Sequence, residues 1–168
     1  SRGDYKVFYP ISTRWSDNDI YGHVNNVTYY SYFDTAANRY LIEEGGMDIG
    51  DGRIVGYVVN SGCEYHAPVT YPEPIEAGLR VERLGNSSVQ YGLAIFREGG
   101  QAAVAHGHFV HVFVDRAANK PVPIPSRLRT ALARRRWETI DAFLSIAGEL
   151  STFAPILPAE PHPTVARP

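Results

Sequence analysis

The chain has 168 residues, of which 44% are hydrophobic and 20% are charged, and its formal net charge is −2 when the histidines are neutral. These values are typical of a folded domain, because a disordered chain is less apolar, and they give no support to non-specific binding of nucleic acid. The single cysteine excludes an internal disulfide framework and a zinc site built from thiolates.

The first third of the chain predicts a strand, a turn and one long helix. Residues 5–15 are rich in aromatic and β-branched side chains, and their proline suits an edge strand. The polar run 16–19 predicts a turn, and a helix is expected from about Asn25 to Glu44, where the glycine pair 45–46 ends it. The apolar positions of this helix recur at helical spacing and form one broad face: Tyr29, Tyr30, Phe33, Ala36, Ala37, Tyr40 and Leu41.

Four β segments are expected next, at residues 54–66, 75–84, 87–97 and 101–115, with a glycine hairpin turn at 99–100. No helix separates these segments, which favours antiparallel pairing, because parallel neighbours require long crossovers. One parity of the first segment is expected to share a face of the sheet: Val55, Tyr57, Val59, Ser61, Cys63 and Tyr65.

The C-terminal part is expected to add an accessory helix. Residues 117–125 break the last strand, and the apolar pattern of 126–147 predicts a second helix. Five of the last 14 residues are proline, so the tail 151–168 is expected to lack regular structure and to lie against a surface. We therefore expect a single domain over residues 1–150, followed by this proline-rich tail.

A long helix with one broad apolar face needs a sheet to cover it. The order of the elements therefore predicts an α+β fold, in which a curved, five-stranded antiparallel sheet wraps round the long helix.

The N-terminus shows no basic-then-apolar signal pattern, and no apolar run reaches the roughly 18 residues that a membrane span requires. A cytoplasmic protein is expected.

The densest group of polar residues lies between the first strand and the long helix. One interpretation is an elaborate helix cap, in which Asn25 or Asn26 accepts hydrogen bonds from free N–H groups. This interpretation leaves Asp19, Gly22 and His23 without a role. The other interpretation is a site for acyl transfer or hydrolysis. There, N–H groups at the helix start hold a carbonyl oxygen as it becomes an oxyanion, while a carboxylate attacks the carbonyl or deprotonates a water.

The run D-x-D-x-x-G-H-V-N-N-x-x-Y, from Asp17 to Tyr29, resembles the 4-hydroxybenzoyl-CoA thioesterase-like branch of the hotdog-fold acyl-CoA thioesterases. The resemblance covers about residues 5–130. It implies a hotdog fold and the hydrolysis of an acyl thioester to a free acid and coenzyme A. Three later segments agree with it: residues 65–68, 71–75 and 120–125.

The resemblance also implies roles for individual residues. Asp19 would be the catalytic carboxylate, either as nucleophile or as general base, and the backbone N–H groups from Val24 to Asn26 would polarise the thioester carbonyl. His23 and Asn26 would assist, as an Asn/His pair does in related acyl-ACP thioesterases. The benzoyl-CoA enzymes carry apolar or aromatic residues where this chain has polar ones, so their substrate class does not transfer. The expected substrate contacts are Val24, Asn25, Tyr29 and Ser61.

Neither a metal nor a redox cofactor is implied, and coenzyme A enters only as part of the small-molecule substrate. A homodimer or a dimer of dimers is expected, with segment 54–66 at the interface and Asp19 facing the partner's copy of that segment. Two alternatives stay open. One is an enoyl-CoA hydratase-like hotdog enzyme, and the other is a hotdog protein that binds acyl-CoA without turnover.

Other candidate residues favour structural roles. Asp17 is expected to form the turn or to pair with Arg14, although an extended chain would place it beside Asp19. Cys63 is expected to be a small buried hydrophobe. Three histidines on the last strand suggest a metal cluster, but one of them has the opposite parity, so no metal is expected there: His106, His108 and His111. Several arginines are equal candidates for the coenzyme A phosphates: Arg83, Arg127, Arg129 and Arg134 to Arg136.

Overall fold

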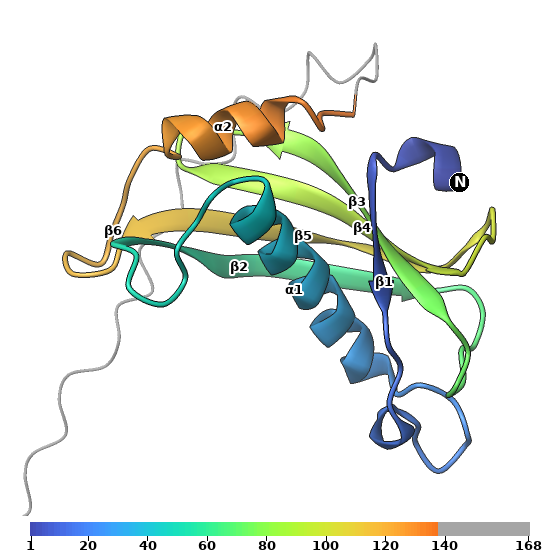
Figure 1. Ribbon diagram of the computed structural model, residues 1–168. Coiled ribbons are helices and arrows are strands. Elements are labelled where there is room, and N and C mark those ends of the chain that lie inside the picture. Colours follow the sequence, from blue (N-terminus) through green and yellow to red (C-terminus); the bar gives the residue numbers. More distant parts are fainter. Residues whose placement is uncertain (138–168) are drawn as a thin grey trace, which may run out of the picture. The chain divides into compact units, whose positions relative to one another are not determined.

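The computed structural model of the protein describes residues 1–137 (Figure 1). Within this range, no helix is long and apolar enough to cross a membrane. The helical elements are η1 (Arg2–Asp4), η2 (Trp15–Asp17), α1 (Asn26–Glu43) and α2 (Ser126–Ala133). The strands are β1 (Val7–Ile11), β2 (Ile54–Tyr65), β3 (Ile75–Leu84), β4 (Ser88–Arg97), β5 (Ala103–Asp115) and β6 (Lys120–Pro121).

The five long strands form one antiparallel sheet in the order β1-β3-β4-β5-β2. The short β6 continues the sheet beside the end of β5, where Val114 pairs with Pro121. Pro10 lies in β1, and an edge strand tolerates a residue that cannot donate to a ladder on both sides. The other edge is β2, which pairs only with β5 among the described strands.

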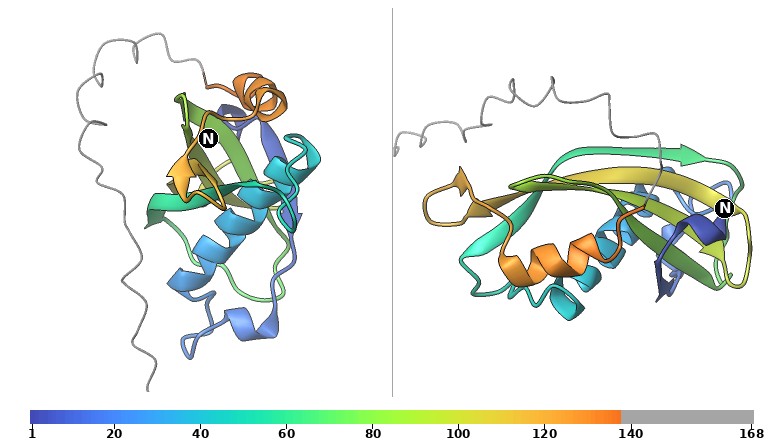
Figure 2. Two further views of the ribbon diagram at one scale, coloured as in Figure 1. Left: turned by 90° about the vertical axis from the view of Figure 1, so that its left-hand side faces the viewer. Right: turned by 90° about the horizontal axis from the view of Figure 1, so that it is seen from above.

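The long helix α1 lies against one face of the curved sheet, and the sheet bends round it (Figure 2). Its buried side chains are those predicted, except that Tyr32 is buried where Tyr30 was expected. The hydroxyl of Tyr40 donates to the carbonyl of Ala131 over 2.7 Å and joins α1 to α2. Gly46 adopts a φ of 67°, which ends the helix as expected. This arrangement is an α+β hotdog fold, and the predicted fold class is confirmed.

The prediction that the odd-numbered residues of β2 share one face is wrong. The register with β5 shifts between Val58 and Asn60, which leaves Val59 as an extra residue in the strand. Tyr57 pairs with Val112 and Ser61 pairs with Phe109, so their side chains point to opposite faces. The bulge places Ser61 on the face that α1 covers.

The first strand is shorter than the expected range 5–15. Its pairing ends where Ile11 meets Ile75, because Ile75 is the first residue of the partner strand β3. The carboxylate of Asp17 then accepts from the backbone N–H of Arg14 over 2.9 Å and turns the chain into η2. The loop that follows carries the predicted site.

The second helix was expected over 126–147, and it ends at Ala133 instead. Beyond that point the chain pairs with β3: the N–H of Val81 donates to the carbonyl of Arg135, and Trp137 donates back to the carbonyl of Val81. The edge of β3 is free there because β1 pairs only as far as Leu79. Residues 138–147 and the tail 151–168 lie outside the described residues.

Candidate active site at the start of α1

Asp17 anchors the loop between β1 and α1. Its side chain is buried, and its two carboxylate oxygens accept from the Tyr32 hydroxyl over 2.7 Å and from the backbone and side chain of Arg14 over 2.9 Å each. Burial acts to raise the pKa of this carboxyl, but the hydrogen bonds from Tyr32 and Arg14 outweigh it and hold the pKa below its usual value. The expected pairing with Arg14 is confirmed, and Asp17 serves as a structural anchor.

Residues 18–24 form a small hairpin that presents Asp19. Asn18 and Val24 make an antiparallel bridge. Inside it, the N–H of Asp19 donates to the carbonyl of His23 over 2.8 Å, and the N–H of Gly22 donates to the carbonyl of Asp19 over 3.0 Å. Gly22 has a φ of 79°, which a residue with a Cβ adopts only with strain. The hairpin therefore explains why the motif needs a glycine at this position.

Only one of the two carboxylate oxygens of Asp19 accepts a hydrogen bond within the described residues. One oxygen accepts the N–H of Tyr21 over 2.8 Å, as in an Asx turn. Across residues 1–137, the other oxygen has no hydrogen-bond partner. The side chain is partly exposed, so a carboxylate oxygen is open to a substrate or to a water.

Of the three backbone N–H groups expected to form the oxyanion site, two are already occupied. The N–H of Val24 donates to Val69 over 2.7 Å, and the N–H of Asn25 donates to Asp17 over 2.8 Å. In the described part of the chain, the N–H of Asn26 has no acceptor. It is the first residue of α1, where the helix dipole adds partial positive charge. The structure thus reduces the expected set of donors to Asn26.

The asparagine cap is also present. The side-chain oxygen of Asn25 accepts the N–H of Val27 over 3.1 Å, which is the geometry of a helix N-cap. The cap interpretation is therefore confirmed for Asn25, and it does not conflict with the interpretation of the motif as a site for acyl transfer or hydrolysis.

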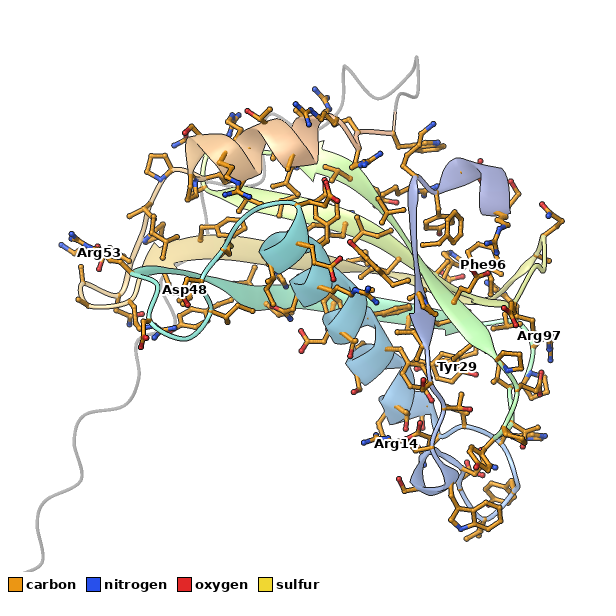
Figure 3. All side chains as sticks on the ribbon, viewed as in Figure 1. Arg14, Tyr29, Asp48, Arg53, Phe96 and Arg97 are labelled. Carbon is orange, nitrogen blue, oxygen red and sulfur yellow. The ribbon has the colours of Figure 1, made fainter. Side chains whose placement is uncertain are left out.

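The remaining predicted side chains lie on different surfaces. His23 and Asn26 are exposed beside the hairpin, and no hydrogen bond joins either side chain to the Asp19 carboxylate within residues 1–137. Tyr29 is buried, with its ring 5.1 Å from that of Tyr65. Ser61 lies exposed on β2. Figure 3 shows Tyr29 at the same end of α1 as Arg14, away from the end of the molecule that carries Asp48.

Two tyrosines that sequence reasoning did not place in the site help to build it. The hydroxyl of Tyr65 donates to the carbonyl of Asn26 over 3.0 Å, which brings the end of β2 to the start of α1. The hydroxyl of Tyr32 holds Asp17, as described above. In a sequence, both residues count as apolar positions. Tyr32 is buried, and a buried tyrosine needs a partner for its hydroxyl, which is the signal that could have found it. Tyr65 is 44% exposed, so the same signal does not apply to it.

Thr70 fixes the hairpin from a second loop. Its hydroxyl donates to the carbonyl of Gly22 over 2.6 Å, and the side chain of Asn18 donates to the same hydroxyl over 3.2 Å. The N–H of Tyr71 donates to Asn18 in return. The loop between β2 and β3 thus holds the hairpin in place on the side away from α1.

The described residues offer no metal site at Asp19, because their one group of three converging ligands lies elsewhere, at Glu64, His66 and His106. Cys63 is half-buried against the core, and burial raises the pKa of its thiol, which makes it a poor nucleophile. The site therefore consists of a carboxylate and a helix N–H group, a pair that suits attack on a carbonyl.

Comparisons with known proteins identify the family of the chain. Residues 13–132 match the Thioesterase-like superfamily. The structure of the PA5185 protein from Pseudomonas aeruginosa strain PAO1 is 63% identical, with a TM-score of 0.80, and the match covers 82% of this chain and 96% of that one. The PA2801 protein from Pseudomonas aeruginosa is 32% identical over 74% of this chain and 96% of that one, with a TM-score of 0.70.

A third structure is that of BH1999, a gentisyl-coenzyme A thioesterase, which is 25% identical with a TM-score of 0.66, covering 74% of this chain and 98% of that one. The fold and the matched family define a hotdog-fold thioesterase. The chain belongs to the Thioesterase-like superfamily, and it is a thioester hydrolase.

Proposed function

We propose that the protein is an acyl-CoA thioesterase that hydrolyses an acyl thioester to a free acid and coenzyme A. Two observations within residues 1–137 carry this proposal: one carboxylate oxygen of Asp19 has no hydrogen-bond partner, and the N–H of Asn26, at the start of the helix that follows the same hairpin, has no acceptor. The similarity to a gentisyl-coenzyme A thioesterase supports coenzyme A as the carrier of the acyl group.

In the reaction, the thioester carbonyl oxygen would accept the N–H of Asn26. Charge develops on that oxygen as the carbonyl carbon becomes tetrahedral, and the start of α1 stabilises it through a fixed donor and the helix dipole. Removal of one such donor from an enzyme typically costs about 10²–10³ in rate. The N–H of Asn26 is available because it belongs to the first residue of α1, and the first N–H groups of a helix have no carbonyl within the helix to bind.

Asp19 would act in one of two ways. As a general base it takes a proton from a water, whose oxygen attacks the carbonyl carbon. The tetrahedral intermediate then expels the thiolate of coenzyme A, which takes up that proton. As a nucleophile it attacks the carbonyl directly, releases the thiolate and forms a mixed anhydride, which a water then hydrolyses. His23, exposed on the same hairpin, would position the water in either case.

The proposal is tested by the release of free thiol from a panel of aliphatic and aromatic acyl-CoAs. We expect at least one acyl-CoA to be hydrolysed in proportion to protein concentration. The same acyl group on a short thiol carrier should react more slowly, because the carrier lacks the nucleotide end that binds the protein. Consumption of an enoyl-CoA without thiol release would instead indicate a hydratase, and binding without turnover would indicate a carrier protein.

We also propose that the active protein is a homodimer joined through β2. The outer edge of this strand is unpaired within residues 1–137, and it exposes three apolar side chains in succession: Tyr57 at 49%, Val58 at 44% and Val59 at 40%. An unpaired apolar edge of this kind favours pairing with a second sheet. Beside Asp19, the side chains of Ile20 and Tyr21 are also exposed, at 94% and 79%. A partner subunit would cover such surfaces, and Ser61 of the partner subunit would face the thioester.

The dimer predicts a mass of at least twice 18.6 kDa in sedimentation or light scattering. A charged side chain in the middle of β2, Val58→Lys, should shift the protein to monomer and lower its activity with it. Ile49→Lys is the matched control, because Ile49 is similarly exposed, at 41%, but lies outside the strand. A wild-type monomer at micromolar concentration that still hydrolyses thioesters would contradict the proposed interface.

A further inference from the structure

We propose that Glu64, His66 and His106 form a binding site for a divalent transition-metal ion, with zinc as the preferred ion. The three residues lie at the end of β2 and on β5, and one ligand atom from each lies within 4.8 Å of the other two. This site is separate from the reaction at Asp19.

The strand register places the three residues on one face of the sheet. Glu64 pairs directly with His106, so both side chains leave the sheet on the same side. His66 follows two residues after Glu64, and its N–H donates to the carbonyl of Val104 over 2.8 Å, which keeps it beside β5. Ala105, next to His106, points the other way into the core. The cluster therefore lies on the face opposite α1.

The two imidazoles already direct their nitrogens at each other. Nε2 of His66 lies 2.6 Å from Nδ1 of His106, and the ring planes are inclined by only 14°. Only one of these nitrogens can carry the proton that they share, so the other presents a lone pair. A metal ion replaces that proton and takes both lone pairs. At a tetrahedral zinc ion with Zn–N bonds of about 2.0–2.1 Å, the nitrogens stand about 3.3 Å apart. Exposed side chains reach this separation by small rotations.

Glu64 supplies a negative charge beside the two imidazoles. Its carboxylate lies 3.9 Å from Nε2 of His106, and its side chain is 74% exposed and free to move. It can become the third ligand. Two imidazoles and a carboxylate form a ligand set that zinc prefers, and a site with three protein ligands keeps a position open. A hollow of about 660 Å³, which His66 and His106 help to line, gives water access to that position.

The other strand histidines do not join this cluster. His108 points to the same face as His106, but its ring nitrogen is bound to the side chain of Asn60 over 2.7 Å. His111 is buried on the opposite face. His106, His108 and His111 therefore do not converge on one point. The proposed site could not be seen in that run of histidines, because Glu64 lies at the end of β2 and His66 just after it.

The test is a titration of the untagged protein with Zn²⁺, followed by calorimetry, with Co²⁺ as a spectroscopic probe. We expect one ion per chain, visible absorption bands of tetrahedral Co²⁺ and no binding of Mg²⁺, which prefers oxygen ligands. His66→Gln and His106→Gln should each weaken binding by at least about tenfold, and Glu64→Gln by about tenfold. The melting temperature should rise with Zn²⁺ in the wild type and not in His66→Gln.

Two variants serve as controls. His108→Gln removes a histidine from the same strand and face and should bind Zn²⁺ as the wild type does. His23→Gln removes the exposed histidine beside Asp19 and should also leave binding unchanged. The proposal is overturned if no saturable binding occurs, or if His66→Gln and His106→Gln bind as tightly as the wild type. It is also overturned if His23→Gln abolishes binding, because the ion would then sit beside Asp19. Thermal melting in the absence of metal shows whether each variant is folded.

Discussion

Replacing Asp19 by Asn is expected to lower kcat by at least about 10², on whichever acyl-CoA the protein hydrolyses fastest. The substitution keeps the size of the side chain and removes the charge that, in the proposed reaction, accepts a proton or attacks the carbonyl. The amide oxygen of Asn still accepts the N–H of Tyr21, so the hairpin should stay intact and the melting temperature should hardly change. Steady-state thiol release and thermal melting of the same preparation check both expectations.

Asp48→Asn is the matched control for this experiment. Asp48 makes the same kind of turn, since its carboxylate accepts the N–H groups of Gly50 over 3.0 Å and Asp51 over 3.1 Å. It lies after the C-terminal end of α1, away from Arg14 and Tyr29 (Figure 3). Its substitution should leave kcat unchanged. If Asp19→Asn retains more than about half of the wild-type rate, no role in proton transfer or attack is left for this carboxylate.

The antiparallel pairing of the strands could be predicted from the sequence, because short connections cannot join parallel neighbours. The order of the strands could not be predicted in this way, because β2 pairs with β5 and not with β3, the next strand along the chain. The strands from β2 to β5 follow one another without a helix, and each neighbouring pair found is antiparallel. The bulge at Val59 could not be predicted, because two apolar residues in succession, Val58 and Val59, fit either register. Its position depends on the partner strand, and a single sequence contains that information only indirectly.

A candidate site at the start of α1 could be predicted from residue types and spacing, and the choice of Asp19 within it came from the resemblance of the motif. Which backbone N–H group stays unoccupied within residues 1–137 could not be predicted, because the N–H of Val24 donates to the carbonyl of Val69, in a loop far away along the chain. The end of α2 at Ala133 is a similar case. Residues 135–137 form backbone hydrogen bonds with the edge of β3 and therefore do not continue the helix. Contacts between distant segments decided both outcomes.

His111 is a buried titratable residue that has no part in the proposed reaction. Its side chain is 1% exposed, and its ring packs against that of Tyr91 at a centroid distance of 5.2 Å. In the described region, neither ring nitrogen has a hydrogen-bond partner. Burial therefore lowers the pKa of His111 to about 4, since the charged imidazolium would be desolvated without compensation.

The consequence is a loss of stability in mild acid. The unfolded chain takes up a proton at His111 with a pKa of about 6.5, while the folded chain resists protonation until about pH 4. The contribution of a neutral His111 to the free energy of unfolding is thus complete above about pH 6.5, and it is lost as the pH falls towards 4. The difference in pKa corresponds to about 3 kcal/mol, which is a large share of the stability of a typical domain.

Urea unfolding at a series of pH values between about 4.5 and 7.5 measures this loss. The slope should be much flatter in His111→Phe, which fills a similar space and has no group to titrate. His108→Gln, on the same strand but partly exposed, should keep the wild-type slope. Buried or paired carboxylates such as Asp17 and Glu73 have lowered pKa values, so they lose their contributions at lower pH and do so equally in all three proteins. Parallel curves for the wild type and His111→Phe would show that His111 is protonated as easily in the folded chain as in the unfolded one.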